Sequence, residues 1–533
     1  NDNYCGGKMK SKLLIPIMLT ILCSTILIAQ NDLAIKPYGV SPAMIKADTL
    51  GNPNFLGILD RQATGLANAG VETKVYLQGM RNGAMLTSAM WEITQAPDGS
   101  AAAIGVVVDQ DTSTQITSFV PDVVGTYVVT FADAADAADI VINAAKFTGI
   151  EDGKCATCHS GKAEEWAMTG HSTFLKRGVE GLNGSYYNAG CISCHTVGFD
   201  DMAANDGFDD FEFEFPAVKE AGVWDSLLVK YPDAMKRANI QCENCHGPGG
   251  SHFGNTADAK MVSSWSADAC AKCHDDDHYH VYPSQWKTAA HANITSYPGG
   301  NRTSCRGCHN GAQFAQYVAG EPITVETEHI DITCAVCHDP HNVDNEYQLR
   351  TLKATLSNGE MVPAKAGKGA LCMNCHQSRQ EANSYTDQAA GHYGPHYAPQ
   401  ADMLIGTNAV TFGKKLPTSP HLSALDDACV DCHMHEKGSH GEHDDDGNLN
   451  TAGMHSFSMV DINGVDNVIA CSGCHGDVGE SFNHKKFYMN GMADHDGDGD
   501  DEGLQEEVHG LMDKLAMMLP SDDVHQDPDS TWT

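Results

Sequence analysis

The chain has few basic residues and no long apolar run beyond its first 30 residues. Its 533 residues include 33 Lys and Arg against 70 Asp and Glu, a formal net charge of −37 at pH 7. A surface this acidic repels the phosphates of nucleic acids and of anionic membranes. We therefore expect neither as a partner. The charge favours solubility and basic protein partners, and solubility alone is a sufficient explanation of it.

Cysteine is scarce outside one repeated motif, and residues 31–150 contain neither Cys nor His. Of the 20 cysteines, 18 form Cys-x-x-Cys pairs, and a His directly follows each of the nine pairs. In chain order these motifs 1 to 9 are Cys155/Cys158/His159, Cys191/Cys194/His195, Cys242/Cys245/His246, Cys270/Cys273/His274, Cys305/Cys308/His309, Cys334/Cys337/His338, Cys372/Cys375/His376, Cys429/Cys432/His433 and Cys471/Cys474/His475.

The motif Cys-x-x-Cys-His predicts covalent attachment of c-type haem. Two thiols separated by two residues reach the vinyl groups on one porphyrin edge, and the adjacent His then lies under the iron as the proximal ligand. A zinc site or a disulfide framework does not require a His after every pair. Nine such histidines in nine pairs exclude both alternatives, and the sequence predicts nine haems.

Residues 1–30 are predicted to comprise a few upstream residues and a signal peptide. Met9 is followed by Lys10 and Lys12 and by the apolar run Leu13–Ala29, which is short for a spanning helix and is interrupted by Pro16. We expect an exported protein, periplasmic or extracellular at the cell surface, with no membrane span after signal removal. Export suits haem of the c type, which is attached outside the cytoplasm.

Residues 31–150 are predicted to form an all-β domain. Tyr127 in the stretch Asp122–Tyr127 resembles the tyrosine corner of immunoglobulin-like sandwiches, and Trp91 resembles their core tryptophan. Because no Cys pair is present, the likeness is to bacterial adhesion-type modules. Short β-rich runs separated by turn residues predict the strands Lys74–Gln78, Ala89–Thr94, Ala103–Val108, Thr114–Phe119, Thr126–Phe131 and Asp139–Ile142.

The predicted fold is therefore multidomain: an N-terminal immunoglobulin-like β-sandwich precedes a mostly α-helical and irregular cytochrome domain whose core is formed by haems. Residues 151–345 hold motifs 1 to 6 and residues 346–490 hold motifs 7 to 9. An acidic insert, Asp200–Phe215, is interpreted as a solvated loop. Residues 491–533 contain an acidic loop and an amphipathic helix that we expect to pack on the last haem module, with one apolar stripe: Leu504, Val508, Leu511, Leu515 and Leu519.

Of the 27 histidines, nine lie in motifs and 18 remain, and their placement groups the motifs into triplets. One His precedes the middle motif of each triplet, five residues after Trp166 and Trp286 in the first two, and another follows the third motif. The pattern is clear in two triplets and looser in the third. It predicts six distal ligands: His171, His252, His291, His341, His421 and His484.

For the remaining haems we expect His392, His396 and His455, with His329 as a competitor. A solvent-facing or supporting role is an equally good interpretation of each of these four. His435, His440 and His443 lie in an acidic Gly-rich stretch and are predicted to be solvated.

Cys155–His252 resembles the tetrahaem cytochrome family of nitrifying bacteria, the electron acceptor of hydroxylamine oxidoreductase. The resemblance implies mostly bis-His haems stacked in close pairs. Cys334–His341, and Cys429–Met434 with His455–Phe457, resemble larger cytochromes of that superfamily. The residues that carry the first likeness are Cys155-Ala-Thr-Cys-His159, Trp166 to His171, Cys191-Ile-Ser-Cys-His195 and Cys242-Glu-Asn-Cys-His-Gly-Pro-Gly-Gly-Ser-His252.

Three functions remain open. The first is electron transfer between redox partner proteins, which many bis-His haems favour because a saturated iron conducts rather than reacts. The second is an oxidoreductase of nitrogen or sulfur compounds, which needs one haem with an open site. The third is self-assembly into an extracellular cytochrome filament. Electron transfer without catalysis is the preferred interpretation.

A calcium site is a further hypothesis. Asp494, Asp496, Asp498 and Asp500 match the first positions of an EF-hand loop. The position that should hold a bidentate Glu is Gln505. Calcium binding and a plain acidic loop therefore both stay open.

Overall fold

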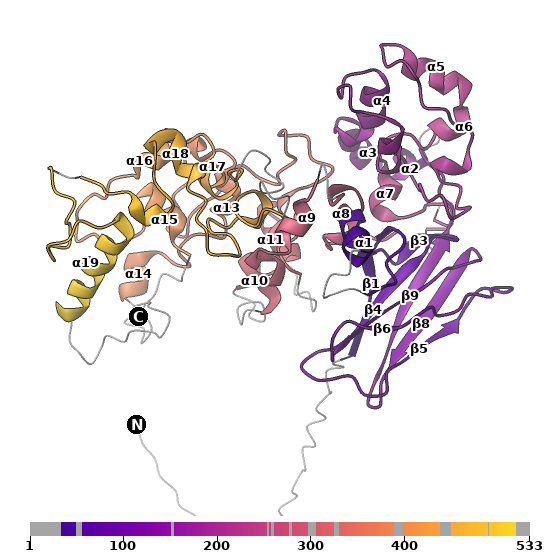
Figure 1. Cartoon of the computed structure of the whole chain (residues 1–533), viewed down its shortest axis with the longest axis horizontal. Coiled ribbons are helices and arrows are strands. Elements are labelled where there is room, and N and C mark those ends of the chain that lie inside the picture. The colour runs from indigo at the N-terminus through magenta and orange to yellow at the C-terminus, as the bar shows by residue number, and fades with distance from the viewer. Residues whose placement is uncertain are drawn as a thin grey trace, which may run out of the picture.

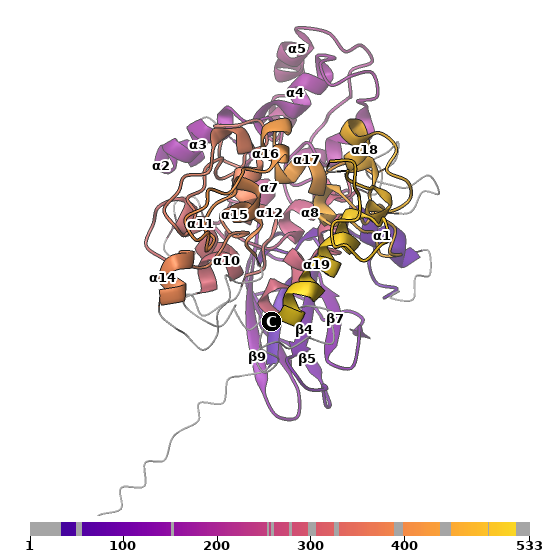
Figure 2. The ribbon, with the colours of Figure 1, turned by 90° about the vertical axis from the view of Figure 1, so that its left-hand side faces the viewer.

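The computed structural model describes residues 33–49, 56–150, 154–252, 255–256, 261–276, 280–296, 305–323, 330–387, 398–437, 449–488 and 490–518. Strands lie at one end of an elongated region of short helices that runs from α2 to α19 (Figure 1). Viewed from the α19 end, the strands lie below and behind the helices (Figure 2). The predicted signal segment lies outside the described residues, as do His329, His392, His396, His440 and His443.

The N-terminal part forms two sheets, with strand orders β2-β1-β4-β7-β6 and β3-β9-β8-β5. Their paired neighbours are antiparallel except β3 and β9, which are parallel. The strands are β1 (Leu33–Val40), β2 (Ala63–Thr64), β3 (Asn68–Gly70), β4 (Val75–Arg81), β5 (Met90–Gln95), β6 (Val108–Asp109), β7 (Thr114–Phe119), β8 (Gly125–Ala132) and β9 (Ala137–Ala145).

The core between the sheets follows the two-residue period of a strand. Tyr127 and Val129 alternate with less buried residues in β8 and join Leu77 in one apolar cluster. The Tyr127 hydroxyl donates to Val123 O at 2.9 Å and accepts from Val123 N at 3.0 Å. The hydrogen bonds expected of a tyrosine corner are therefore present, whereas membership of the immunoglobulin-like class stays a prediction.

Two features of this part differ from the predicted strands. Of Ala103–Val108, only Val108 enters a strand, because the stretch contacts β7 through single bonds such as Gly105 N to Ser118 O at 2.7 Å. Strands β1, β2 and β3 were not predicted, and β1 lies inside the first sheet, between β2 and the central strand β4. Trp91 is partly buried and stacks on Phe131 with ring centroids 4.4 Å apart.

Apart from the 15-residue helix α19, the described helices have at most eight residues. They are α1 (Pro42–Thr49), α2 (Lys154–Cys158), α3 (Ser160–Ala167), α4 (Phe174–Val179), α5 (Val223–Lys230), α6 (Pro232–Met235), α7 (Cys242–His246), α8 (Asp268–His274), α9 (Tyr282–Trp286), α10 (Arg306–His309), α11 (Gly311–Val318), α12 (Cys334–Cys337), α13 (Gly369–Cys372), α14 (Ala382–Asp387), α15 (Gln400–Ile405), α16 (Pro420–Ala424), α17 (Cys429–His433), α18 (Ile469–His475) and α19 (Leu504–Met518).

Short 3₁₀ turns complete the region: η1 (His171–Thr173), η2 (Ala189–Ser193), η3 (Phe208–Asp210), η4 (Ala290–Ser296), η7 (Ala364–Ala366), η8 (Met454–Ser456) and η9 (Phe482–His484). Among the described residues, no helix combines the length and the apolar character needed to cross a bilayer.

The acidic insert is folded rather than solvated, which corrects the prediction for Asp200–Phe215. Phe208 is buried, and the other aromatic residues of the insert pack against the cluster that contains Leu175 and Tyr231. The period-two Asp/Glu/Phe pattern points its phenyl rings inward and its carboxylates outward. The prediction of a solvated loop rested on the charged residues and did not account for the packing of the phenyl rings.

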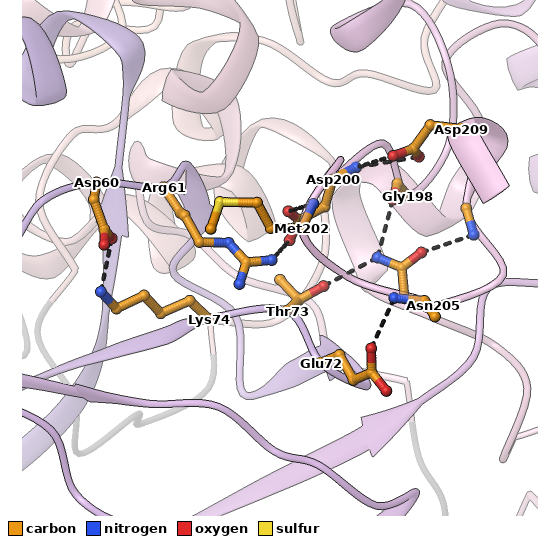
Figure 3. A network of polar contacts seen from close by, with 12 residues as sticks. Asp60, Arg61, Glu72, Thr73, Lys74, Gly198, Asp200, Met202, Asn205 and Asp209 are labelled. Carbon is orange, nitrogen blue, oxygen red and sulfur yellow. Dashed lines mark hydrogen bonds and ion pairs between the residues drawn. The ribbon is translucent and has the colours of Figure 1, made fainter.

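The insert also joins the sheets to the helical region (Figure 3). Arg61 forms an ion pair with Asp200, and both side chains are largely buried. Asn205 Nδ2 donates to Thr73 Oγ1 at 3.0 Å. Farther along, Ser41 Oγ donates to Asp275 Oδ2 at 2.7 Å. The β-sheets are thereby fixed against the segments that carry motifs 1 to 4.

Helix α19 does not bury its apolar stripe within the described part of the chain. Leu504, Val508, Leu511 and Leu515 are 42–58% exposed. The helix instead contacts η9 through its polar start, where Glu507 is buried and accepts backbone hydrogen bonds. The helix thus contacts the last haem module through η9. Packing of the apolar stripe itself on that module stays a prediction, and Leu519 lies outside the described residues.

Candidate haem-binding sites

Each motif begins on, or just before, a short helical turn. In α7 the turn runs from Cys242 to His246, so the two thiols and the imidazole lie three and four residues apart on one side. Motifs 4, 8 and 9 end α8, α17 and α18 in the same way. All 18 motif cysteines are free thiols. They are available for thioether bonds.

Two of the motif cysteines are more exposed than the others. Cys158 of motif 1 and Cys474 of motif 9 are exposed, whereas the other motif cysteines are partly buried. Both belong to the first and last motifs in the chain, which have a neighbouring motif in sequence on one side only. Haem attachment through these two thiols stays a prediction.

Cys474 nevertheless lies near another motif. Burial raises the pKa of the Cys432 thiol, and the nearby thiols of Cys471 and Cys474 raise that pKa further. Motif 9 is thus a neighbour of motif 8, in agreement with the contact between α17 and α18.

Two imidazoles that bind one iron from opposite faces have a characteristic spacing. With iron–nitrogen bonds of about 2 Å and a further 1 Å or so to each ring centre, the centroids lie about 6 Å apart. Five pairs of His rings have this separation: His171–His274 at 6.3 Å, His246–His341 at 6.2 Å, His291–His376 at 6.1 Å, His338–His455 at 6.4 Å and His421–His475 at 5.9 Å.

Each of these pairs joins a motif His to a His outside the motifs. The non-motif partners are five of the predicted distal ligands: His171, His291, His341, His421 and His455. His484 lies elsewhere, with its Nδ1 accepting a hydrogen bond from Glu480 N at 3.2 Å. His252 lies in the loop after α7, where its backbone N donates a hydrogen bond to Gly249 O.

Burial favours the neutral form of several of these rings, which is the form that binds a metal. Desolvation, with smaller repulsions from neighbouring imidazoles, lowers the pKa of His274 to about 3 and that of His291 and His455 to about 4. Burial also lowers the pKa of His171. A buried neutral imidazole retains the nitrogen lone pair that iron requires.

Hydrogen bonds at Nδ1 orient the rings of two motif histidines. His246 Nδ1 lies 2.7 Å from Val262 O, and His338 Nδ1 lies 2.7 Å from Tyr347 O. Ligating histidines typically donate this N–H to a carbonyl, which turns Nε2 toward the metal. The distal candidate His341 does the same with Asp339 Oδ1 at 3.1 Å, and this hydrogen bond holds the pKa of Asp339 well below its usual range. The donor set fits haem iron.

Thiol contacts place successive motifs side by side. Cys155 hydrogen-bonds Cys242, Cys270 hydrogen-bonds Cys334, and Cys372 hydrogen-bonds Cys429. Motifs 1 and 3, 4 and 6, and 7 and 8 are thus neighbours. In addition, Cys273 Sγ lies 3.6 Å from Cys194 O, and Cys308 Sγ lies 3.9 Å from Asn374 O. Motif 2 therefore adjoins motif 4, and motif 5 adjoins motif 7.

Motifs 3 and 6 occupy the same place in the repeat. Trp166 Nε1 donates to Ile240 O at 3.0 Å, and Trp286 Nε1 donates to Ile332 O at 2.8 Å. Both carbonyls stand two residues before the first Cys of the motif. These tryptophans, which the sequence singled out by spacing, hold the third motif of each triplet near the His that precedes the second.

Motif 8 also has the contacts of a third motif, although the triplets derived from the sequence place it in the middle. Its first Cys contacts that of motif 7, and His433 Nδ1 lies 3.0 Å from Phe457 O. Motifs 7 and 8 are then the first and third motifs of one unit that has no middle motif, and motif 9 is the first motif of the next unit. The triplets derived from the sequence assumed three motifs in every unit, so they could not show that this middle motif is missing.

With this register the His pairs follow one rule. The His after each first motif lies opposite the next first motif, as in His171–His274, His291–His376 and His421–His475. The His after each third motif lies opposite the preceding third motif, as in His246–His341 and His338–His455. The pairs therefore join neighbouring units of the repeat.

The acidic loop brings carboxylates together in a different combination from the predicted one. Ligand atoms of Asp494 and Asp496 lie within 4.8 Å of Glu507, and those of Asp496 and Asp498 lie within 4.8 Å of Glu502. Neither group includes Asp500. The fold of the loop, which the sequence spacing could not supply, brings Glu507 into place. Calcium binding stays a prediction.

Comparison with known proteins agrees with this geometry. A family model described as a doubled CXXCH motif matches residues 328–381, which contain motifs 6 and 7. The chain is a multihaem c-type cytochrome.

Similar proteins include the C-type polyheme cytochrome OmcB from two strains of Geobacter sulfurreducens, 25% identical over 302 residues, which cover 47% of this chain and 36% of OmcB. Multiheme cytochrome MtrA from Shewanella baltica is 25% identical over 167 residues, 27% of this chain and 44% of MtrA. The chain thus spans less than half the length of these relatives. No solved structure matches it. The resemblance to the nitrifier tetrahaem family stays a prediction.

Proposed function

We propose that this cytochrome transfers electrons through nine covalent haems, most of them held between two His ligands. Bound haem supplies an iron that exchanges single electrons between its ferric and ferrous states. The observation that carries the proposal is the set of five His pairs with centroids 5.9–6.4 Å apart. Two histidines of such a pair would bind one iron from opposite sides, which would leave no open position for a substrate.

The protein's own residues contribute three things to this role. Burial favours neutral imidazoles at His274, His291 and His455, which are able to bind iron. Carbonyl and carboxylate acceptors fix the ring orientation, as Val262 does for His246 and Asp339 for His341. The thiol contacts between motifs, such as Cys270 with Cys334, would hold the haems of those motifs near one another.

The proposal extends to location and partners. The segment that begins at Met9 supports export to the periplasm or the cell surface. The net charge of −37 supports association with basic redox proteins, steered by electrostatic attraction. Association should therefore weaken steeply as salt is added, because screening shortens the range of attraction.

The test is a haem count combined with electron paramagnetic resonance of the oxidised holoprotein. A pyridine haemochrome assay with intact mass should give nine haems per chain. The spectrum should be dominated by low-spin ferric signals. A count well below nine, or high-spin signals from most of the haems, would contradict the proposal.

A further inference from the structure

A tight hairpin after motif 4 carries a histidine that the sequence did not single out. Asp275 and Val281 form an isolated antiparallel bridge, and His280 precedes the second of these residues. His280 N donates to Asp276 Oδ1 at 2.9 Å, and Asp276 N donates to His280 O at 2.8 Å. The backbone of His280 is therefore held at both of its polar groups.

The ring of His280 has an unused nitrogen. Its Nδ1 is buried and has no hydrogen-bond partner among the residues that the structure describes. Within the described residues, Nδ1 of His455 is also buried without a hydrogen-bond partner. His455 is the histidine whose ring lies opposite that of His338. A buried nitrogen without a partner is costly unless something absent from the polypeptide binds the ring.

His280 is not the second ligand opposite His274. Their ring centroids lie 5.4 Å apart, which is closer than the other pairs, and His171 already lies opposite His274 at 6.3 Å. The hairpin belongs to the motif that contacts motif 2 through Cys273 and Cys194. His280 is thus carried to the neighbourhood of motif 2.

The motif 2 imidazole is held in a fixed orientation by Tyr187. Tyr187 OH lies 3.0 Å from His195 Nδ1, and the Tyr187 ring stacks on it with centroids 5.4 Å apart. This contact leaves Nε2 for iron. Burial, and then the nearby His280 and His171, lower the pKa of His195 to about 4.

We propose that His280 supplies the sixth ligand of the haem attached at Cys191 and Cys194, opposite His195. This inference rests on the proposed haem binding and completes the ligand rule. By this rule, as at His280, a His that follows a first motif binds the haem of the middle motif in the preceding unit. The missing middle motif between motifs 7 and 8 then accounts for the separate placement of His484, which follows a first motif with no middle motif before it.

The experiment uses the full-length holoprotein with His280→Gly, and His435→Gly as the matched control. The backbone O of His435, not its ring, accepts from Asn467 Nδ2 at 3.1 Å. We expect His280→Gly to keep its haem count and to show a new high-spin ferric signal from about one haem in nine. Added imidazole should restore the low-spin spectrum, because it fills the vacated position. The control should show neither change.

A second background identifies which haem is affected. In a Cys191→Ala, Cys194→Ala variant, which lacks the motif 2 haem, His280→Gly should add no high-spin signal. A new signal there would mean that His280 serves another haem, and its absence in the single variant would mean that His280 is not a ligand. Either result overturns the inference. High-spin signals throughout the unmutated protein would instead count against the proposed function itself.

Discussion

The hydrogen bond between Asp339 and His341 allows a redox shift to be calculated. Replacing Asp339 with Asn removes one negative charge and keeps an acceptor oxygen. The far nitrogen of a ligating imidazole lies about 4 Å from iron. Since 3.1 Å separates His341 Nδ1 from Asp339 Oδ1, the carboxylate lies about 7 Å from the metal. The negative charge stabilises ferric iron over ferrous iron, so its removal raises the reduction potential.

Coulomb's law at an effective dielectric constant of about 20 gives about 2.4 kcal/mol over this distance. For a one-electron couple that energy corresponds to about 100 mV. The Asp339 side chain is 24% exposed and is shared with Arg350, whose Nη1 lies 3.3 Å away. Solvent and this cation screen the charge, so we expect about half the shift, roughly 50 mV.

Spectroelectrochemical titration of the holoprotein measures the effect. About one ninth of the haem absorbance should move to a potential roughly 50 mV higher in Asp339→Asn. Asp344→Asn, which removes an exposed carboxylate from the same loop, is the control and should shift no component by more than about 20 mV. Unchanged potentials in Asp339→Asn, or an equal shift in both variants, would refute His341 as a ligand.

Three further predictions concern stability. Tyr127→Phe removes a hydroxyl that is hydrogen-bonded to Val123 and Asp122. It should lower the free energy of unfolding of the β-sheets by about 1–2 kcal/mol in urea titration; no change would contradict the corner's role. Arg61→Leu leaves Asp200 buried without its cation and should cost about 2–3 kcal/mol, more than Arg61→Lys. Burial raises the pKa of Asp461, but Lys437 and backbone N–H groups outweigh it and hold that pKa below its usual range. Stability should therefore fall below about pH 4, and Asp461→Asn should flatten that dependence in acid titrations.

Local patterns were enough to predict the motifs, five histidines whose rings lie opposite motif histidines, and most of the strands of the two sheets. A Cys-x-x-Cys-His run carries its chemistry within five residues, and the strand Thr114–Phe119 was predicted with its observed bounds. His341 was predicted because it follows motif 6 closely in the chain, whereas His455 was one of several candidates for the remaining haems. Which motif each of them faces depends on packing between units, so spacing alone left that open.

The misses arose where a residue's role depends on distant contacts. His280, the ligand proposed for the motif 2 haem, directly precedes Val281 of the isolated Asp275–Val281 bridge. Its spacing from the motifs does not mark it as a ligand. The acidic neighbours of Phe208 predicted a solvated loop, but Phe208 is buried in the cluster that contains Tyr231.

The most direct test is an experimental structure of the holoprotein that resolves iron coordination at motif 3. The account predicts an iron bound by His246 and by His341, which follows motif 6 in the next unit of the repeat. An iron at motif 3 bound by His252, or His341 bound to the haem of its own motif 6, would contradict ligation between units.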